Sequence, residues 1–377
     1  MVMQKGRAKV VIVTADSKVG GGSSHILGLI RNLDRDKFEL HLVCPSGYLS
    51  KLAKQINSVD VYNIPMSSKF DLESIFALRT RLRQIQSAGN PFTPFLIHTH
   101  GPRAGFFASL VAPRMARKVY TEHIYDQNYR LPSTINGWIQ KMMLRKVCLE
   151  QDLVLAVSTS VKKFLVSNKF ADANQVKVVP NGLDVEAWSA QKRKIELSAN
   201  APIIGTLGTL NAQKGQKFLI SAFKEVLKKF EHATLEIIGD GPLFEALKSQ
   251  TRSLKIEGRV KFLGAKENPI EYMRDWSLFA LPSISETFGI AALEAMALGI
   301  PVVASKVGGL PDIIDNQKNG ILVPAKDAEI LAKAMLGVLE HPAVAAKLRR
   351  EGEKRAADFD IKKVVREIEE VYLKLVG

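Results

Sequence analysis

Cysteine is scarce in this sequence, and long apolar runs are absent. Cys44 and Cys148 are the only cysteines among 377 residues, which excludes a disulfide framework and a Cys-x-x-Cys motif. This cysteine usage is typical of a reducing compartment. No apolar run approaches the roughly 18 residues of a transmembrane helix, and no charged segment followed by an apolar one opens the chain. We therefore expect a cytoplasmic protein with neither a transmembrane helix nor a secretory signal.

Acidic residues are too few to balance the basic ones in the first half. Residues 1–190 carry 25 Lys and Arg against 14 Asp and Glu, whereas the remainder carries 28 against 24. This excess predicts an anionic partner, such as phosphorylated saccharide or an anionic membrane surface, although general solubility explains it equally well. The basic residues lack interleaved aromatics and a helix-turn-helix pattern, so nucleic acid is not an expected partner.

A dinucleotide-binding fingerprint is also missing. Residues 9–14 form an expected buried strand, a glycine run follows at 20–22, and a helix is expected over about 24–33. This layout brings backbone N–H groups close to phosphate. The fingerprint needs glycine or alanine at position 25, where His25 stands, so a nicotinamide-dependent enzyme is disfavoured. The glycine run is a candidate phosphate loop, with a plain tight turn as the alternative.

Histidines follow two expected strands of the first half. His98 and His100 are two residues apart and would share a face of the strand expected over 95–99. His123 follows the strand expected over 118–121, where open α/β sheets bind ligands. The three histidines could be set around a metal, but no carboxylate or cysteine cluster joins them, so we predict no metal site.

Residues 280–312 give the strongest signal in the chain. A short apolar strand ends at Pro282, a polar loop follows, and a helix is expected over about 288–298 with Thr287 as a possible N-cap. Gly299 and Pro301 end that helix. The helix is apolar almost all round, which is typical of a buried helix.

Acceptor and donor groups gather at the start of this expected helix. Glu294 is its single charge, and a lone buried carboxylate needs a partner from elsewhere in the molecule. Glu286 stands just before the helix, whose first N–H groups form an anion site that Gly289 leaves open. Carboxylates bind hydroxyls and N–H groups bind phosphate. The pattern therefore predicts a site for a nucleotide sugar.

The segment SETFGIAALEAMALGIPVVAS, with the later Gly308–Gly309 pair, closely resembles the Glu-x7-Glu signature of the retaining GT-B glycosyltransferases of family 4 (glycosyl transferases group 1). The resemblance implies an α/β GT-B fold, in which two Rossmann-like domains with parallel sheets face a cleft. It implies transfer of a hexose or hexosamine from a nucleotide sugar, with a UDP-sugar favoured, to an acceptor hydroxyl of an envelope polysaccharide or glycolipid. It also implies retention of anomeric configuration and no metal or other cofactor.

The same resemblance assigns roles to individual residues. Glu294 would bind the ribose hydroxyls, Glu286 would orient the donor sugar, and His123 would contact the sugar near the reacting carbon. Lys214, with the N–H groups of Gly289 and Ile290, would stabilise the leaving diphosphate. The expected catalytic residues are Glu286, His123 and Lys214. The expected donor-binding residues are Gly21, Gly22, Thr209, Lys214, Glu286, Thr287, Phe288, Gly289, Ile290 and Glu294, and the candidate acceptor-binding residues are His100, Arg103 and Asn181.

One position departs from the family pattern. The loop after the first strand of the second half reads Gly-Thr-Leu-Asn-Ala-Gln-Lys-Gly, whereas the family has arginine in place of Thr209. One positive charge for the diphosphate is therefore missing. This departure keeps a non-catalytic sugar-nucleotide-binding partner subunit open as an alternative, and a sugar-nucleotide epimerase of similar fold is another.

The chain length suggests two domains. We place an acceptor-binding domain at 1–186, a linker at 187–202 and a nucleotide-sugar-binding domain at 203–360. The last helix, 361–377, would cross back to the first domain by analogy of fold. Besides the cytoplasm, the basic first domain makes the inner face of the cytoplasmic membrane a candidate location.

Overall fold

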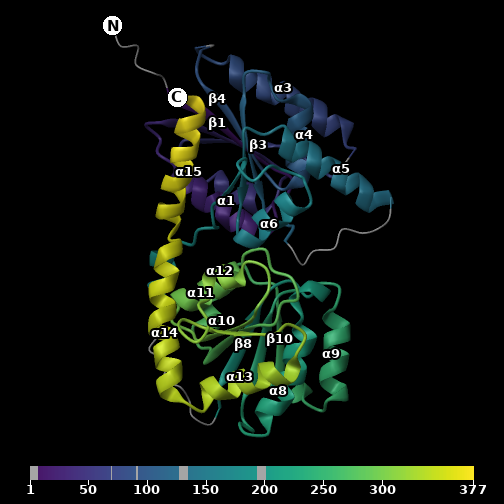
Figure 1. Ribbon diagram of the computed structural model, residues 1–377, viewed down its shortest axis with the longest axis vertical. Coiled ribbons are helices and arrows are strands. Elements are labelled where there is room, and N and C mark those ends of the chain that lie inside the picture. Colours follow the sequence, from purple (N-terminus) through teal and green to yellow (C-terminus); the bar gives the residue numbers. More distant parts are fainter. Residues whose placement is uncertain (1–6, 69, 91, 127–134, 193–200) are drawn as a thin grey trace. The chain divides into compact units, whose positions relative to one another are not determined.

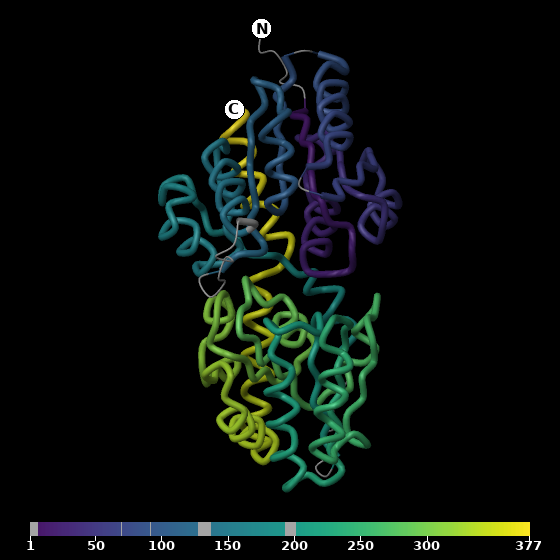
Figure 2. The backbone as a smooth tube through the Cα atoms, turned by 90° about the vertical axis from the view of Figure 1, so that its right-hand side faces the viewer, coloured from purple at the N-terminus to yellow at the C-terminus, as the bar shows by residue number. Residues whose placement is uncertain are grey.

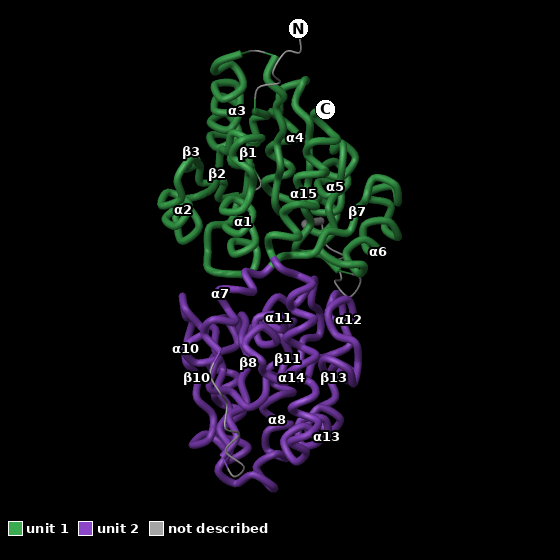
Figure 3. The backbone as a smooth tube through the Cα atoms, turned by 90° about the vertical axis from the view of Figure 1, so that its left-hand side faces the viewer, with its two compact units in different colours: residues 1–182, 361–377 green, residues 183–360 purple. Residues whose placement is uncertain are grey.

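The protein consists of two compact units. The structure, a computed structural model, describes residues 7–68, 70–90, 92–126, 135–192 and 201–377. The N-terminal unit contains Met1–Gly182 and Ile361–Gly377, and the C-terminal unit contains Leu183–Asp360 (Figure 3). Within the described ranges, no helix is both long and apolar enough to cross a membrane.

The N-terminal unit is built on a parallel sheet of seven strands in the order β3-β2-β1-β4-β5-β6-β7. The strands are β1 (Ala8–Thr14), β2 (Phe38–Cys44), β3 (Val59–Asn63), β4 (Phe95–His100), β5 (Arg117–Glu122), β6 (Leu153–Ala156) and β7 (Val176–Val178). All residues of β1 are buried, as expected for a central parallel strand covered on both faces. Neighbouring strand ends therefore gather on one edge of the sheet.

Helices cover both faces of this sheet (Figure 1). They are α1 (Gly21–Asn32), α2 (Tyr48–Ala53), α3 (Leu72–Ser87), α4 (Pro102–Val111), α5 (Ile135–Leu149), α6 (Thr159–Ser167) and α15 (Ile361–Val376). Val10 and Ile12 of β1 pack in a core cluster with α1 and α15. The alternating residues Val11 and Val13 pack with α3 and α4. Successive side chains of β1 point to opposite faces of the sheet and thus pack into two separate cores.

The C-terminal helix is part of the N-terminal unit. Buried residues of α15 recur at three- and four-residue spacing, which makes one apolar face. This face lies against α1, and Tyr372 packs edge-on against Phe38. The Tyr372 hydroxyl also reaches the sheet and bonds His98 Nδ1 at 2.6 Å. In Figure 2 the yellow end of the chain lies among the elements of this unit.

The C-terminal unit has a parallel sheet of six strands in the order β10-β9-β8-β11-β12-β13. The strands are β8 (Ile203–Leu207), β9 (Thr234–Ile238), β10 (Val260–Gly264), β11 (Leu278–Leu281), β12 (Val302–Ser305) and β13 (Ile321–Val323). The helices are α7 (Val185–Ser189), α8 (Gln216–Leu227), α9 (Phe244–Ser253), α10 (Ile270–Met273), α11 (Ile290–Ala297), α12 (Leu310–Ile313), α13 (Ala328–Leu339) and α14 (Pro342–Ala356), with 3-10 turns at Ala212–Lys214, Glu257–Arg259 and Ala357–Phe359. Each unit therefore has the strand–helix alternation of a Rossmann-like domain.

Several element boundaries differ from the sequence-based expectation. Helix α1 begins at Gly21, so two glycines of the expected loop form the first helical residues. Helix α11 begins at Ile290 rather than at residue 288. Residues 187–189 of the expected linker belong to α7, whereas 193–200 lie outside the described residues. Because neither α1 nor α11 has a side-chain cap, the sequence carried no signal for where these two helices begin.

Candidate active site

The start of α11 depends on a glycine that another residue would replace only with strain. Gly289, the N-cap residue, has φ +102°, and a Cβ there would lie 2.5 Å from Leu310 Cδ2. No side chain caps the helix, so the expected capping by Thr287 is wrong. The first N–H groups, beginning at Ile290, have no intrahelical acceptor. This helix start can bind an anion.

Lys214 and Glu286 form an ion pair in the same unit. Lys214 Nζ lies 2.6 Å from Glu286 Oε2, which also accepts a hydrogen bond from Ser283 Oγ at 3.1 Å. Only 10% of the Glu286 side chain is exposed. The two residues stand on loops that follow the adjacent strands β8 and β11. Ile284 N–H donates to the Gln213 carbonyl at 2.6 Å and ties these loops together.

The turn that carries Lys214 is held from both sides. Asn211 Oδ1 accepts the N–H groups of Gln213 and Lys214. Gly215 follows with φ +64°, and a Cβ there would lie 2.2 Å from the Pro282 carbonyl oxygen. The lysine is therefore positioned by its backbone before its side chain meets Glu286. Sequence reasoning identified Lys214 but missed the supporting roles of Asn211 and Ser283.

Glu294 stands on α11 as an enclosed carboxyl group. Burial raises its pKa from 4.5 to about 7, because an ionised carboxylate loses hydration in an apolar environment. No side-chain partner for Glu294 is found among the described residues. Glu294 as a whole is half-buried, so part of the residue remains accessible. A hydroxyl donor from a bound ligand would satisfy this group.

The remaining expected donor residues occupy different environments. Phe288 is buried, with its ring 5.8 Å from that of Phe359, so its side chain belongs to the core. Thr287 and Ile290 are half-buried beside the helix start. Thr209 is exposed, and its carbonyl accepts a hydrogen bond from Gln216 Nε2 at 3.0 Å. Thr209, which stands where the family has arginine, thus contributes no charge to this loop.

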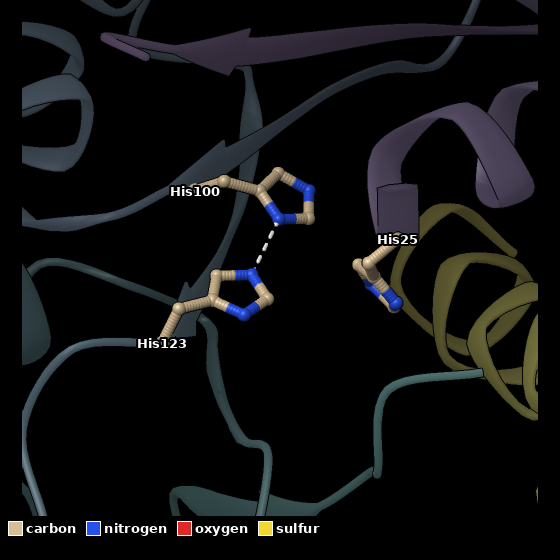
Figure 4. A group of neighbouring side chains, drawn as sticks. All are labelled: His25, His100 and His123. Atoms are coloured by element: carbon tan, nitrogen blue, oxygen red, sulfur yellow. Dashed lines mark hydrogen bonds between the residues drawn. The ribbon is translucent and has the colours of Figure 1, made fainter. Parts of the chain in front are cut away.

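Four histidines gather in the N-terminal unit. His98 is fully engaged, with Nδ1 on the Tyr372 hydroxyl and Nε2 on Thr121 Oγ1 at 2.7 Å. His100 Nδ1 lies 3.0 Å from His123 Nε2. His25, from α1, lies close to both (Figure 4). The pairing of β4 with β5 brings His100 and His123 together. His25 was missed because it appeared in sequence only as a break in the glycine fingerprint.

Burial keeps these imidazoles neutral. It lowers the pKa of His25 from 6.5 to about 4 and that of His98 to about 3. It also lowers the pKa values of His100 and His123 well below their usual range, with neighbouring imidazoles adding to the effect. A charged imidazolium would lose its hydration there. Near pH 7 the cluster therefore acts through uncharged ring nitrogens that accept or donate hydrogen bonds.

A cavity of about 410 Å³ lies at the carboxyl-end edge of the N-terminal sheet. Its lining includes Asp16 after β1, together with His100, Arg103 and Tyr125. Arg103 Nη1 also donates to the carbonyl of Met66 at 2.9 Å, which fixes the guanidinium against a neighbouring loop. Two of the three candidate acceptor residues thus line one cavity.

Other expected residues of this unit lie elsewhere. Asn181 does not line the cavity, and its buried Oδ1 has no hydrogen-bond partner within the described ranges. Gly21 and Gly22 form the first turn of α1 and are also absent from the lining. A Cβ at Gly22 would meet nothing within 4 Å, so this position is open.

Comparison with known families covers both units. The model for glycosyltransferase family 4 matches residues 19–187, and the model for glycosyl transferases group 1 matches residues 189–355. The two matches together account for most of the chain. The second includes the Lys214 loop and the whole of α11.

Relatives and solved structures agree with these matches. An uncharacterized glycosyltransferase of Methanocaldococcus jannaschii is 29% identical over 83% of this chain and 84% of its own length. The UDP-Gal:alpha-D-GlcNAc-diphosphoundecaprenol alpha-1,3-galactosyltransferase of Escherichia coli is 22% identical over 91% of each chain. The structure of Anabaena HepE in complex with UDP-glucose superposes with a TM-score of 0.79 at 23% identity, and the match covers 97% of this chain and 100% of that one.

The two Rossmann-like parallel sheets and these structural neighbours define a GT-B protein, as the sequence predicted. The chain belongs to the family 4 (group 1) glycosyltransferases, and it is a glycosyltransferase enzyme.

Proposed function

We propose that this enzyme transfers a hexose or hexosamine from a nucleotide sugar to an acceptor hydroxyl with retention of anomeric configuration. A UDP-sugar is the favoured donor, since the structural neighbours include HepE complexes with UDP and with UDP-glucose. The observation that carries the proposal is the Lys214–Glu286 pair at 2.6 Å, on loops next to an uncapped helix start. It offers a cation and N–H donors for phosphate beside a carboxylate for sugar hydroxyls.

The proposed roles follow from the chemistry of each group. Lys214 and the N–H groups of Gly289 and Ile290 stabilise the departing diphosphate, and each preorganised donor of this kind contributes a few kcal/mol as an order of magnitude. Glu286 accepts the sugar hydroxyls, which requires that its contact with Lys214 rearrange when the donor binds. Glu294 accepts the ribose hydroxyls. These groups neutralise the leaving anion in place, so transfer proceeds without a metal.

The N-terminal unit supplies the acceptor side in this proposal. His123 contacts the donor sugar near the reacting carbon, and His100 and Arg103 line the cavity that receives the acceptor. The proposed acceptor is an envelope polysaccharide or a glycolipid. The names of two relatives support this choice, the Escherichia coli enzyme acting on a diphosphoundecaprenol-linked sugar and the capsular polysaccharide glycosyltransferase CapM of Staphylococcus aureus.

The helices α3 and α5 of this unit support a peripheral membrane location. They flank α4 (Figure 1), and their exposed apolar side chains include Phe76 at 60% and Trp138 at 63% exposure. Exposed basic residues stand on the same helices: Arg79, Arg83, Lys141 and Arg145. Apolar side chains inserted at the headgroups, with cations around them, bind anionic lipid. We propose the inner face of the cytoplasmic membrane, tested by co-sedimentation with phosphatidylglycerol vesicles, which Phe76→Ser should weaken and added salt should reverse.

A thermal-shift panel tests the donor site. UDP, GDP, ADP, NAD and several UDP- and GDP-sugars are added to wild type, Glu294→Ala, Glu286→Ala and the exposed control Glu245→Ala. A ligand that binds only the folded state raises the unfolding midpoint. We expect UDP to stabilise wild type, Glu286→Ala and the control, and to have little effect on Glu294→Ala. A flat response of wild type to every nucleotide would contradict the proposed site.

Turnover separates the enzyme from the alternatives. With a UDP-sugar and no acceptor, slow donor hydrolysis is expected, and it should be lost in Glu286→Ala but kept in Glu245→Ala. Conversion to an isomeric nucleotide sugar would instead reveal an epimerase. Binding without any turnover would favour a non-catalytic partner subunit. Wild-type transfer by Glu286→Ala would refute the assignment of that carboxylate.

A further inference from the structure

Three imidazoles converge in the N-terminal unit. His25 from α1, His100 at the end of β4 and His123 after β5 each offer one ring nitrogen, and these nitrogens all lie within 4.8 Å of one another (Figure 4). The ring centroids are 5.3 to 5.7 Å apart. All three residues belong to the same unit. Two stand at the ends of paired strands and one on a helix, so the backbone fixes their approach.

The cluster contains buried nitrogens that the fold leaves unsatisfied. Nδ1 of His25 and Nε2 of His100 have no hydrogen-bond partner in the described part of the chain, and these side chains are only 2% and 4% exposed. Buried polar atoms are nearly always bonded, so these two need an explanation. His98 provides the contrast, because Tyr372 and Thr121 satisfy both of its nitrogens.

The ligand chemistry selects a late first-row divalent metal. Such ions bind neutral imidazole, and the three converging side chains are all imidazoles. Mg²⁺ and Ca²⁺ prefer oxygen ligands. Glu122, next to His123 in sequence, is already engaged by the Tyr120 hydroxyl and by the N–H groups of Ile124 and Tyr125.

The spacing also fits zinc. Tetrahedral Zn²⁺ has Zn–N bonds of about 2.0–2.1 Å, which places neighbouring ligand nitrogens about 3.4 Å apart. The approaching ring nitrogens of the three histidines all lie within 4.8 Å of one another, which exceeds this spacing by no more than about 1.4 Å. The widest separation, at most 4.8 Å, closes by rotation of the side chains.

We propose that His25, His100 and His123 form a Zn²⁺-binding site with a fourth coordination position open to water or ligand. Where the metal takes the two nitrogens that now share a hydrogen bond, the shared proton moves to the far nitrogen of the same ring. One further consequence rests on the proposed function. Because that proposal assigns His123 to the donor sugar, bound Zn²⁺ holds this imidazole away from it and inhibits transfer.

Metal binding is measured on the untagged full-length protein. Zn²⁺ is titrated against a chromogenic chelator, and Co²⁺ is added as a spectroscopic probe of geometry. Wild type should bind one equivalent of Zn²⁺ and give the intense visible bands of tetrahedral Co²⁺. His25→Gln should weaken binding by about a hundredfold or more, since even lost outer-shell partners cost about 10- to 100-fold. The exposed control His232→Gln should bind as wild type does.

Two results would overturn the site. One is equal Zn²⁺ affinity of His25→Gln and wild type, with folding of the variant checked by its unfolding transition. The other is absence of stoichiometric Zn²⁺ binding, or an octahedral Co²⁺ spectrum, in wild type, which decides the matter even when the variant fails to fold. Added Mg²⁺ should not compete.

The transfer assay keeps the two proposals distinguishable. Saturating Zn²⁺ should reduce transfer by wild type. His25→Gln should transfer at the same rate with Zn²⁺ as without it. If Zn²⁺ binds but transfer is unaffected, the inhibition and the role of His123 are wrong and the metal site stands. If no transfer occurs under any metal-free condition, the proposed function is wrong, and the binding result is unchanged.

Discussion

In the C-terminal unit, Glu286, Gly289 and Glu294 lie on one short stretch of chain, and Lys214 joins them from the loop after a neighbouring strand. In the N-terminal unit, His25, His100 and His123 come from a helix and two strand ends that are distant in sequence. The first arrangement can be recognised in the sequence as a motif. The second cannot, because its histidines are far apart in sequence and meet only in the folded unit.

Burial shifts the pKa values of the two groups in opposite directions. It raises the pKa of Glu294 to about 7 and lowers that of His25 to about 4. In both cases the uncharged form is favoured, because a low-dielectric environment disfavours ions. Near pH 7 the imidazoles are neutral, whereas Glu294 is poised to ionise. In the proposed mechanism, charge stabilisation of transfer therefore falls mainly to the C-terminal unit, where the cation Lys214 lies beside Glu286.

Lys214→Met tests this comparison with the largest expected effect. If Lys214 faces the leaving diphosphate, as proposed, loss of this cation should reduce kcat by about 10²–10³-fold, as for a lost oxyanion donor. Lys224→Met, an exposed position on α8, is the control and should keep wild-type turnover. Steady-state transfer with a UDP-sugar measures both. A loss of less than about threefold would remove Lys214 from the chemistry.

His123→Gln should have a smaller effect. The variant loses one hydrogen bond to the sugar in a buried site, which costs about 1–3 kcal/mol, or about 5- to 150-fold in kcat/KM. The amide keeps a donor and an acceptor, so folding should be preserved, as circular dichroism would verify. A larger loss than that of Lys214→Met would reverse the division of labour between the units.

Glu294→Gln should change the pH dependence of stability in the ligand-free protein. The wild-type carboxyl ionises near pH 4.5 when unfolded but near pH 7 when folded. The free energy of unfolding therefore falls as the pH rises from about 4.5 to about 7, and the loss is complete above that. A pKa shift of one unit corresponds to about 1.4 kcal/mol of stability. Because Glu294 is partly exposed, the actual loss of stability is smaller than the full shift implies.

The glutamine of Glu294→Gln does not ionise, so the free energy of unfolding of this variant does not fall in this way as the pH rises. We expect it to exceed wild type by about 1–3 kcal/mol at pH 8 and to match it at pH 4. Urea unfolding at the two pH values measures the difference. Glu122, whose pKa is also raised to about 7, is present in both proteins and cancels. Equal stability at pH 8 would mean that Glu294 has a polar environment.

Thr209→Arg should have the smallest effect. An added cation on this exposed loop should lower the donor KM by about two- to fivefold, in line with about 0.5–1 kcal/mol for a partly exposed charge contact. Thr209→Gln adds length without charge and should leave KM unchanged. An unaltered KM in the arginine variant would show that the diphosphate does not reach this loop.

The sequence predicted the strand–helix alternation of both units and the donor motif because these depend on local patterns. The buried runs of β1 and β11 and the apolar helix with one carboxyl follow from periodicity alone. The exact starts of α1 and α11 were missed because the N-cap residue of each helix is a glycine, which offers no side-chain cap. Thr287 was a reasonable cap from sequence, but Gly289 ends the loop two residues later with a positive φ.

The amino-acid sequence by itself determined the family and the GT-B class, and it predicted the donor-site residues Glu286, Gly289 and Glu294, since these share one continuous motif. The tertiary structure alone decided which histidines meet. His98, although next to His100 in the strand, is satisfied by Tyr372 from the last helix, whereas His25 arrives from α1. The pairing of Lys214 with Glu286 also required the adjacency of β8 and β11. Contacts of this kind depend on strand order and burial, which a linear pattern does not contain.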